Sequence, residues 1–297
     1  MFLMTYFRTE AEALHFALSD DGLNWRALNG NRPIWRATLG SQSVRDPFVL
    51  RDQNGVYRLF STNGWNADSI LLADSRDGLE WTNERLVPLM RGIAGVRNCW
   101  APECFYDGDD GVYRAIWSSS LDVRSRHELE ASADWDHRIW TASTRDFHEW
   151  SAPELFFDPG HSVIDATVVR HDDERGHRWM MAWKDERGQN VPGQEFKRIK
   201  TSFARTSRGP WMDDSAFLTP ELSEGPTLFW RRDPQRGDGW TMFYDLFLGE
   251  RFGAIHSPDG LTWSDISDEV RFPPGPRHAG VIEIPDEDGA RLEASAA

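Results

Sequence analysis

Short stretches of alternating apolar and polar residues recur along the chain, and each leads into a polar turn and a tryptophan. The pattern occurs as LHFALSDDGLNW (14–25), ILLADSRDGLEW (70–81), IWTASTRDFHEW (139–150), KTSFARTSRGPW (200–211) and FGAIHSPDGLTW (252–263). Such alternation predicts β-strands with one buried face, and Asp-Gly is typical of tight turns between strands. Because the tryptophans are 56, 69, 61 and 52 residues apart, the sequence predicts a β unit repeated roughly every 60 residues.

Two further series of short apolar strands lie between these turns. One series begins each repeat: RDPFVLRD (45–52), WAPECFYD (100–107), IDATVVRHD (164–172), EGPTLFWRR (224–232) and RHAGVIEIP (277–285). The other follows in four repeats: GVYRLFS (55–61), GVYRAIWS (111–118), HRWMMAWKD (177–185) and GWTMFYD (239–245). Strands rich in aromatic and β-branched residues, separated by Gly and Asp turns, predict an all-β protein. Three or four such strands in each repeat are typical of a β-propeller.

The two ends of the chain complete one repeat between them. The repeat that begins at Arg277 has a first strand, but too few residues follow it for a whole blade. Residues 1–8 and 14–19 have the pattern of the missing second and third strands. We therefore predict a five-bladed β-propeller, closed by N- and C-terminal strands that share the last blade, with residues 1–297 in one domain.

The composition narrows the range of partners. Asp and Glu total 48 against 33 Lys and Arg, so the formal net charge is −15. An acidic surface repels nucleic acid and anionic membranes, and no apolar run approaches the roughly 20 residues of a membrane span. We therefore expect neither nucleic acid nor a membrane as a partner. The N-terminus has no secretory signal, which predicts a cytoplasmic protein for the chain as given, or a secreted or periplasmic one if a signal has been removed.

Two local features are predicted to be structural. A short helix is predicted within residues 125–136, where Ser125 and Glu128 have the spacing of a capping box, and no long helix is expected. Cys99 and Cys104 are five residues apart on one predicted strand, so their side chains point to opposite faces and cannot pair with each other. We expect two buried thiols.

The repeats differ most at the start of the first strand of each blade. In a propeller the first strand lines the central channel and its start opens on one face, whereas the repeated tryptophan turns lie on the opposite face. The first strands begin with Asp46, Trp100, Asp165, Glu224 and His278. Three carboxylates at one mouth of the channel indicate a catalytic site. The tryptophan turns recur in most blades, so a structural role is expected for them.

Two long inserts are predicted at the same mouth. Residues 120–137 and 186–198 join the second and third strands of blades two and three. Long loops on a rigid scaffold commonly shape functional sites. We expect these two to narrow the mouth to a pocket with one entrance, which favours an enzyme that acts at chain ends.

The motifs at the mouth resemble those of glycoside hydrolase family 43 over almost the whole chain. They are Arg45-Asp46-Pro47, Trp100-Ala101-Pro102-Glu103, Ile164-Asp165, Glu224-Gly225-Pro226 and Arg277-His278, one in each blade. The resemblance implies hydrolysis of a glycosidic bond with inversion, with Asp46 as general base, Glu224 as general acid and Asp165 as modulator of the acid. In such a reaction one carboxylate activates water and one carboxylic acid protonates the leaving oxygen, roughly 6.5–9.5 Å away. A third carboxylate nearby disfavours ionisation of the acid.

Further residues near the mouth are candidates for contacts with the substrate. They are Arg45, Trp100, Trp117, Phe247, Arg251, Arg277 and His278. Trp100 and Trp117 could stack on a sugar ring, although burial in the core is an equal alternative for Trp117. Phe247 and Arg251 lie on the predicted rim of blade four, near the leaving group. The resemblance implies that His278 holds a central water or, through water, a structural Ca²⁺ ion, and no cofactor is expected to be required.

The expected partner is an arabinose- or xylose-containing oligosaccharide or polysaccharide. The resemblance favours an α-L-arabinofuranosidase, with a β-D-xylosidase as the alternative. An invertase-like enzyme would need a nucleophilic aspartate motif in residues 1–25, which is not found there. A glycoside phosphorylase would need a basic cluster such as Lys184, Lys197, Arg198 and Lys200. A non-catalytic carbohydrate-binding propeller is disfavoured because all three carboxylates are present.

Overall fold

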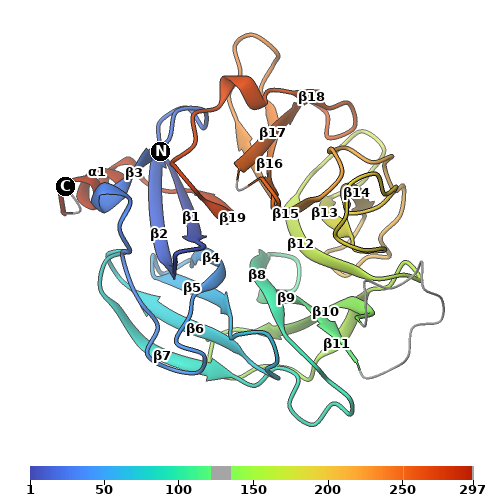
Figure 1. Cartoon of the computed structure of the whole chain (residues 1–297), viewed down its shortest axis with the longest axis horizontal. Helices are drawn as coiled ribbons and strands as arrows, with labels where there is room; N and C mark the ends of the chain where they lie inside the picture. Colours follow the sequence, from blue (N-terminus) through green and yellow to red (C-terminus); the bar gives the residue numbers. More distant parts are fainter. Residues whose placement is uncertain (122–134, 250, 296–297) are drawn as a thin grey trace.

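The structure, a computed structural model, describes residues 1–121, 135–249 and 251–295, whose strands form five antiparallel sheets around a central axis (Figure 1). Blade one contains β4 (Arg45–Arg51), β5 (Tyr57–Thr62), β6 (Ile70–Ser75) and β7 (Trp81–Val87). Blade two contains β8 (Trp100–Asp107), β9 (Val112–Ser120), β10 (His137–Thr144) and β11 (Glu154–Phe157). Blade three contains β12 (Val163–Arg170), β13 (Trp179–Asp185) and β14 (Arg198–Ala204). Blade four contains β15 (Ser223–Arg231), β16 (Gly239–Leu246), β17 (Arg251–Ser257) and β18 (Ser264–Asp265).

Blade five joins the two ends of the chain. It contains β19 (Arg277–Glu283), β1 (Phe2–Arg8), β2 (Ala11–Ser19) and β3 (Arg26–Ala27), in that order from the channel outward. Leu3 on β1 is opposite Ile282 on β19 and Leu18 on β2, so the first strand of the chain is paired on both edges. The predictions of a five-bladed propeller and of a last blade shared by both termini are confirmed.

Apolar side chains of neighbouring blades fill the spaces between the sheets. One cluster joins blade five to blade one and includes Leu3, Phe16, Val49 and Leu59. Four further clusters lie between the other pairs of neighbouring blades. The apolar core of the described residues is therefore divided among the inter-blade spaces, and this leaves the central channel to polar side chains.

The repeated tryptophan turns have the structural role that the sequence predicts. The indole Nε1 atoms of Trp25 and Trp81 each donate a hydrogen bond of 3.2 Å to the carbonyl oxygen of the turn glycine, Gly22 or Gly78. The turn aspartate also accepts backbone N–H groups, as Asp77 does from Leu79 and Glu80. The same side chains thus close the turn and pack its tryptophan against the neighbouring blade.

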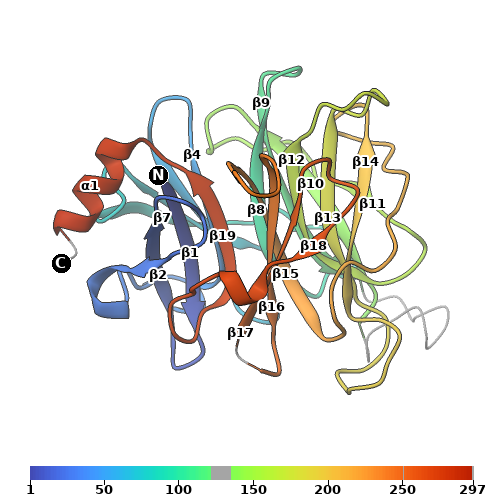
Figure 2. The same ribbon diagram turned by 90° about the horizontal axis from the view of Figure 1, so that it is seen from above.

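Helix α1 (Asp286–Ser295) was not predicted from the sequence, and it lies at the outer edge of the ring (Figures 1 and 2). Its sequence, DEDGARLEAS, has too few apolar residues to form an apolar stripe, which is the usual signal of a packed helix. Leu292 nevertheless is fully buried in the cluster between blades five and one. Asp288 accepts hydrogen bonds from Tyr57 Oη at 2.7 Å and Arg51 Nε at 3.0 Å. These contacts bind the helix to blade one.

Other predictions have mixed outcomes. Cys99 and Cys104 are both free and buried, as expected. The predicted helix at 125–136 lies almost entirely outside the described residues. Short 3₁₀ turns occur at Leu28–Asn31 and Ser267–Glu269. No helix among residues 1–121, 135–249 and 251–295 is both long and apolar enough to cross a bilayer.

The packing of α1 gives a prediction for stability. Leu292→Ala should lower the free energy of unfolding by about 2–5 kcal/mol, because it removes a buried leucine and leaves a cavity over Gly78. Urea unfolding followed by tryptophan fluorescence measures the change. Leu261→Ala is the matched control, because Leu261 is 45% exposed and its loss should change stability by less than about 0.5 kcal/mol. Equal losses in both variants would contradict the docking of α1.

Candidate active site

The second or third residue of the first strand of every blade lies in the left-handed region of backbone conformation. These residues are Asp46, Ala101, Asp165, Gly225 and His278, with φ of 48°, 47°, 55°, 54° and 39°. The register of each first strand shifts at the same place, as in a β-bulge. Bulges redirect side chains, and a non-glycine residue at positive φ is held there only by surrounding contacts. One backbone feature, used five times, therefore aims side chains into the mouth of the channel.

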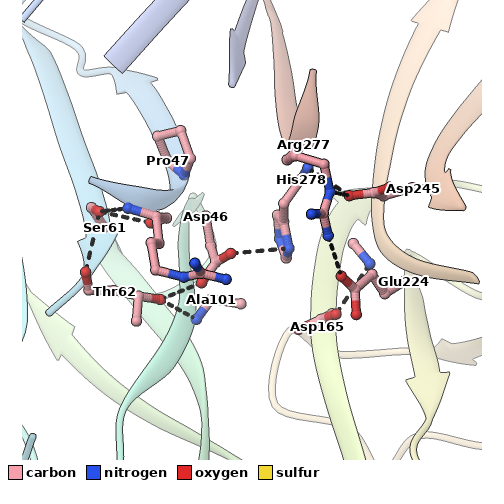
Figure 3. A network of polar contacts seen from close by, with 12 residues as sticks. Asp46, Pro47, Ser61, Thr62, Ala101, Asp165, Glu224, Asp245, Arg277 and His278 are labelled. Atoms are coloured by element: carbon pink, nitrogen blue, oxygen red, sulfur yellow. Dashed lines mark hydrogen bonds and ion pairs between the residues drawn. The ribbon is translucent and has the colours of Figure 1, made fainter. Parts of the chain in front are cut away.

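Hydrogen bonds hold Asp46 and Asp165 and connect each of their blades to the next (Figure 3). Thr62 Oγ1 donates to Asp46 Oδ2 at 2.6 Å and accepts from the backbone N–H of Ala101 at 2.8 Å. The backbone N–H of Gly225 donates to Asp165 Oδ2 at 3.1 Å. Each carboxylate is thus fixed in position. Asp165 bonds to the next blade directly, whereas Asp46 is linked to the next blade through Thr62.

Glu224 lies between two cations. Its Oε1 atom accepts from Arg277 Nη2 at 3.3 Å, and its Oε2 atom accepts from Lys184 Nζ at 3.1 Å. Each cation also contacts a buried carboxylate: Arg277 Nε lies 2.6 Å from Asp245 Oδ2, and Lys184 Nζ lies 2.8 Å from Glu186 Oε2. The Glu224 side chain is 22% exposed, so it remains open to a bound molecule.

His278 lies between the carboxylates of opposite blades (Figure 3). Its Nδ1 atom is 3.5 Å from Asp46 Oδ1. Burial lowers the pKa of this histidine, but the surrounding carboxylates, Asp46 and Asp165 foremost, outweigh burial and leave the pKa above its ordinary value. His278 therefore holds a proton more readily than a free histidine does.

Burial keeps several of these acids protonated at unusually high pH. It raises the pKa of Asp165 to about 6, although the positive charges of His278 and Lys184 oppose the change. It raises the pKa of Asp245 to about 7 and that of Glu103 to about 8. Three carboxyl groups around one channel thus titrate well above the usual range, which is typical of catalytic sites.

A cavity of about 390 Å³ opens at this mouth of the channel. Of the predicted site residues, it is lined by Arg45, Asp46, Trp100, Asp165, Glu224, Phe247, Arg277 and His278. The described ends of the two inserts contribute Trp135, His137, Glu186 and Asn190. The structure therefore brings most of the predicted residues together, and both inserts reach the mouth as expected.

Two predicted contact residues do not line the cavity. Trp117 is 1% exposed and packs in the cluster between blades one and two, where its Nε1 atom donates to Ser119 Oγ at 3.1 Å. Of the two alternatives for Trp117, burial in the core is confirmed and stacking on a sugar is wrong, because β9 is a second strand and this residue faces the neighbouring blade. Arg251 begins β17 and is exposed, outside the residues that line the cavity.

Aromatic side chains form one wall of the cavity. Trp100 packs against Trp65 with ring centroids 5.3 Å apart and against Trp135 with ring centroids 4.8 Å apart. Trp100 Nε1 also donates to the carbonyl oxygen of Trp65 at 3.0 Å. Trp65 is 60% exposed, which is unusual for so large an apolar side chain. A wall of this kind can stack on the apolar face of a sugar ring.

Thr62, Lys184 and Asp245 contact the carboxylates but were not among the residues predicted for the site. All three lie near the ends of second strands, at β5, β13 and β16. In a propeller these ends open at the same mouth as the starts of first strands. A prediction that also considered the ends of the second strands would therefore have included these three residues.

The described residues do not include three or more His, Cys, Asp or Glu side chains grouped so that they could ligate a metal ion. The Nδ1 atom of His278 faces Asp46 Oδ1 at 3.5 Å, so that nitrogen is already engaged. These residues do not fit a directly coordinated ion. A Ca²⁺ ion held by His278 through water stays a prediction.

Gly225 gives a prediction for the integrity of the site. A Cβ atom at this position would lie 2.9 Å from Cγ of His278, so Gly225→Ala should displace the histidine ring. Gly30→Ala is the matched control, because Gly30 has a similar φ of 59° and nothing within 4 Å of the added atom. Both variants carry the strain of positive φ, roughly 1 kcal/mol, and the excess loss of unfolding free energy in Gly225→Ala, about 1–3 kcal/mol, measures the contact. Equal losses would contradict a tight contact at His278.

Comparisons with known proteins agree with the fold and the motifs. A family model described as "Probable glycosyl hydrolase domain", Glyco_hydro_43_rel, matches residues 1–289. An α-L-arabinofuranosidase of Bifidobacterium longum subsp. longum is 25% identical over 173 residues, which cover 50% of this chain and only 16% of that protein.

Solved structures show the same fold at low identity. A thermostable family-43 glycoside hydrolase has a TM-score of 0.57 and 17% identity, covering 78% of this chain and 75% of its own. An α-L-arabinofuranosidase from Lactobacillus brevis has a TM-score of 0.57 and 16% identity, covering 75% and 72%. The predicted resemblance is confirmed, and the chain belongs to the glycosyl hydrolase family that is related to glycoside hydrolase family 43.

Proposed function

We propose that this protein is an inverting, exo-acting glycoside hydrolase that removes α-L-arabinofuranosyl groups from plant cell-wall oligosaccharides or polysaccharides. The observation that carries the proposal is the set of three carboxylates from blades one, three and four around one cavity, each in a different environment. Asp46 accepts from a hydroxyl group, Asp165 accepts from a backbone N–H, and Glu224 accepts from two cations. Carboxylates that differ in this way can take different roles in acid–base catalysis.

In the proposed reaction, Asp46 is the general base and Glu224 the general acid. Asp46 takes a proton from a water molecule as the water oxygen bonds to the anomeric carbon. The bond from that carbon to the leaving oxygen breaks, and Glu224 gives its proton to this oxygen. Attack and departure on opposite faces of the sugar invert the configuration at the anomeric carbon.

Asp165 acts through the acid in this proposal. It neighbours Glu224 through the N–H of Gly225, the next residue in the chain. When Asp165 is ionised, its negative charge disfavours the loss of a proton from Glu224. Its own pKa of about 6 places this change of charge within the working range of many enzymes.

The charges of the cavity support a neutral sugar as the substrate. Arg45 pairs with Glu12 at 2.5 Å, and Lys184 and Arg277 pair with the carboxylates described above. Each Lys and Arg that lines the cavity in the described part of the chain therefore already has a carboxylate partner. This arrangement supports hydrolysis over phosphorolysis, which needs cations available for phosphate, and Lys197 of the suggested phosphate cluster is buried against Glu186.

The choice of arabinose rests on the Bifidobacterium relative, which carries that activity in its name but extends far beyond the matched segment. The exo mode rests on the wall of Trp65, Trp100 and Trp135 and on the insert residues that border the cavity on one side. A β-D-xylosidase remains the second candidate, and it is separated from the first by the substrate assay below.

The first experiment compares aryl α-L-arabinofuranosides with aryl β-D-xylosides. Wild-type protein should hydrolyse the arabinofuranoside faster. Glu224→Gln should reduce kcat/KM by about 10²–10⁴-fold on a substrate with a poor leaving group, and by less on an activated nitrophenyl glycoside that needs little protonation. Glu283→Gln, an exposed residue at the far end of β19, is the control and should be as active as wild type. Full activity of Glu224→Gln on the poor leaving group would exclude it as the acid.

Asp165→Asn tests the modulator through the pH dependence of kcat/KM. The variant removes a negative charge near Glu224, so the acid should lose its proton at lower pH. The basic limb of the profile should therefore move toward acidic pH by about one unit. A basic limb at the wild-type position in a folded variant would remove Asp165 from this role.

A further inference from the structure

In each blade, one residue of the second strand pairs with the start of the first strand. In several blades this residue also contacts the next blade. These residues are Thr62 opposite Arg45, Ser118 opposite Trp100, Lys184 opposite Ile164, Asp245 opposite Glu224 and Phe7 opposite Arg277. Three of them accept a hydrogen bond from the backbone N–H of the strained residue in the next blade: Thr62 from Ala101, Ser118 from Asp165 and Asp245 from His278, at 2.8, 3.1 and 3.3 Å. The position thus fixes the active-site strand of the following blade.

Lys184 breaks this pattern in a specific way. An ammonium group has donors and no acceptor, so Lys184 cannot receive the N–H of Gly225 in the next blade. That N–H goes instead to Asp165, and Lys184 donates to the side chain of Glu224 at 3.1 Å. Phe7 also lacks an acceptor and packs against the guanidinium of Arg45 in the next blade, whereas Lys184 contacts a catalytic carboxylate of the next blade.

A buried cluster holds Lys184 in its charged form. Its side chain is 2% exposed, and its Nζ atom lies 2.8 Å from Glu186 Oε2. Lys197 Nζ, fully buried, contacts the other oxygen of Glu186 at 2.6 Å. Burial alone would raise the pKa of Glu186, but the two lysines outweigh it and lower that pKa to about 2. Burial likewise opposes the charge of Lys184, yet Glu186 and Glu224 raise its pKa above the ordinary value.

We propose that Lys184 is a positioning residue for Glu224 and that the Lys184–Glu186–Lys197 cluster sets the upper pH limit of catalysis. The proposal rests on the role of Glu224 as general acid. Lys184 contributes a positive charge that does not titrate in the working range and that favours the ionised form of the acid. It holds the Oε2 atom while Arg277 holds Oε1, so that the proton donor has one orientation.

Other charged groups surround Glu224, and their charges act on it together with that of Lys184. They are Asp46 on β4, Asp165 on β12, Glu186 and Lys197 on the insert after β13, Asp245 on β16, and Arg277 and His278 on β19. Asp165 and Lys184 act on the acid with opposite signs. Their removal should therefore move the pH profile in opposite directions, which a loss of packing would not do.

The test is the pH profile of kcat/KM for Lys184→Met, which keeps the length of the side chain and removes its charge. The basic limb should move to higher pH by about one unit or more, because ionised Glu224 loses a contacting cation. Lys184→Arg keeps the charge and should return the limb to the wild-type position. Lys200→Met is the matched control, since Lys200 lies on β14 and pairs with Asp214 at 3.7 Å, away from Glu224; its limb should not move.

A second variant protects the test against misfolding. Lys184→Met leaves Glu186 with one of its two cations, whereas Lys184→Met/Glu186→Gln removes a pair of opposite charges together. The double variant should shift the limb in the same direction but less, because Lys184 contacts Glu224 directly and the negative charge of Glu186 is lost with it. If the basic limb stays in place or moves to lower pH in either folded variant, the proposal is overturned, whatever the loss of rate.

A measurement without turnover separates this proposal from the proposed function. The side-chain carboxyl of Glu224, labelled with ¹³C and assigned by its absence in Glu224→Gln, is titrated by NMR in wild type and in Lys184→Met. Its midpoint should rise by about one unit or more in the variant. An unchanged midpoint overturns the role of Lys184. A shifted midpoint combined with full activity of Glu224→Gln on poor leaving groups instead sinks Glu224 as the acid and leaves the charge coupling intact.

Discussion

The bond between the second strand of one blade and the strained start of the next is the interaction on which this site depends. Asp46, Asp165 and His278 have backbone conformations that are unfavourable for non-glycine residues, at roughly 1–3 kcal/mol each. Asp165 and His278 are held by hydrogen bonds across blades, and Asp46 is held by Thr62 of its own blade and by His278 of blade five. The strain is therefore carried by the ring as a whole, and the apolar clusters between blades keep the ring rigid enough to hold it.

The bonds between blades explain how a site with a polar centre keeps its side chains in fixed positions. Acids that face one another across a channel repel, and burial adds to that cost, as the raised pKa values of Asp165 and Asp245 indicate. The guanidinium of Arg277, between Glu224 and Asp245, offsets the repulsion, and Asp46 and Asp165 in turn raise the pKa of His278, which then favours its charged form. The arrangement balances charge locally, so that each carboxylate can differ from its neighbours in its affinity for protons.

Much of the fold and the core of the site could be predicted from the sequence because a repeated blade makes differences between repeats visible. Asp46, Asp165 and Glu224 were identified in this way. The two alternatives for Trp117 could not be separated from the sequence, because strand alternation does not say whether a face meets the channel or a neighbouring blade. In the sequence, Lys184 looks like one of several basic residues, with Lys197 and Lys200. Only the fold shows that it packs against Glu186, from the insert, and is a buried charge beside the acid.

The pairing of β1 with β19 links catalysis to the order in which the chain is made. The strand that carries Arg277 and His278 is synthesised after every other strand, yet its partner β1 is synthesised first. Until β19 arrives, β1 presents an unpaired edge that other chains could join. During the same interval Glu224 lacks one of its two cations, and Asp46 lacks the imidazole beside it. The edge of β1 is therefore covered, and the charges of the site completed, by the same strand.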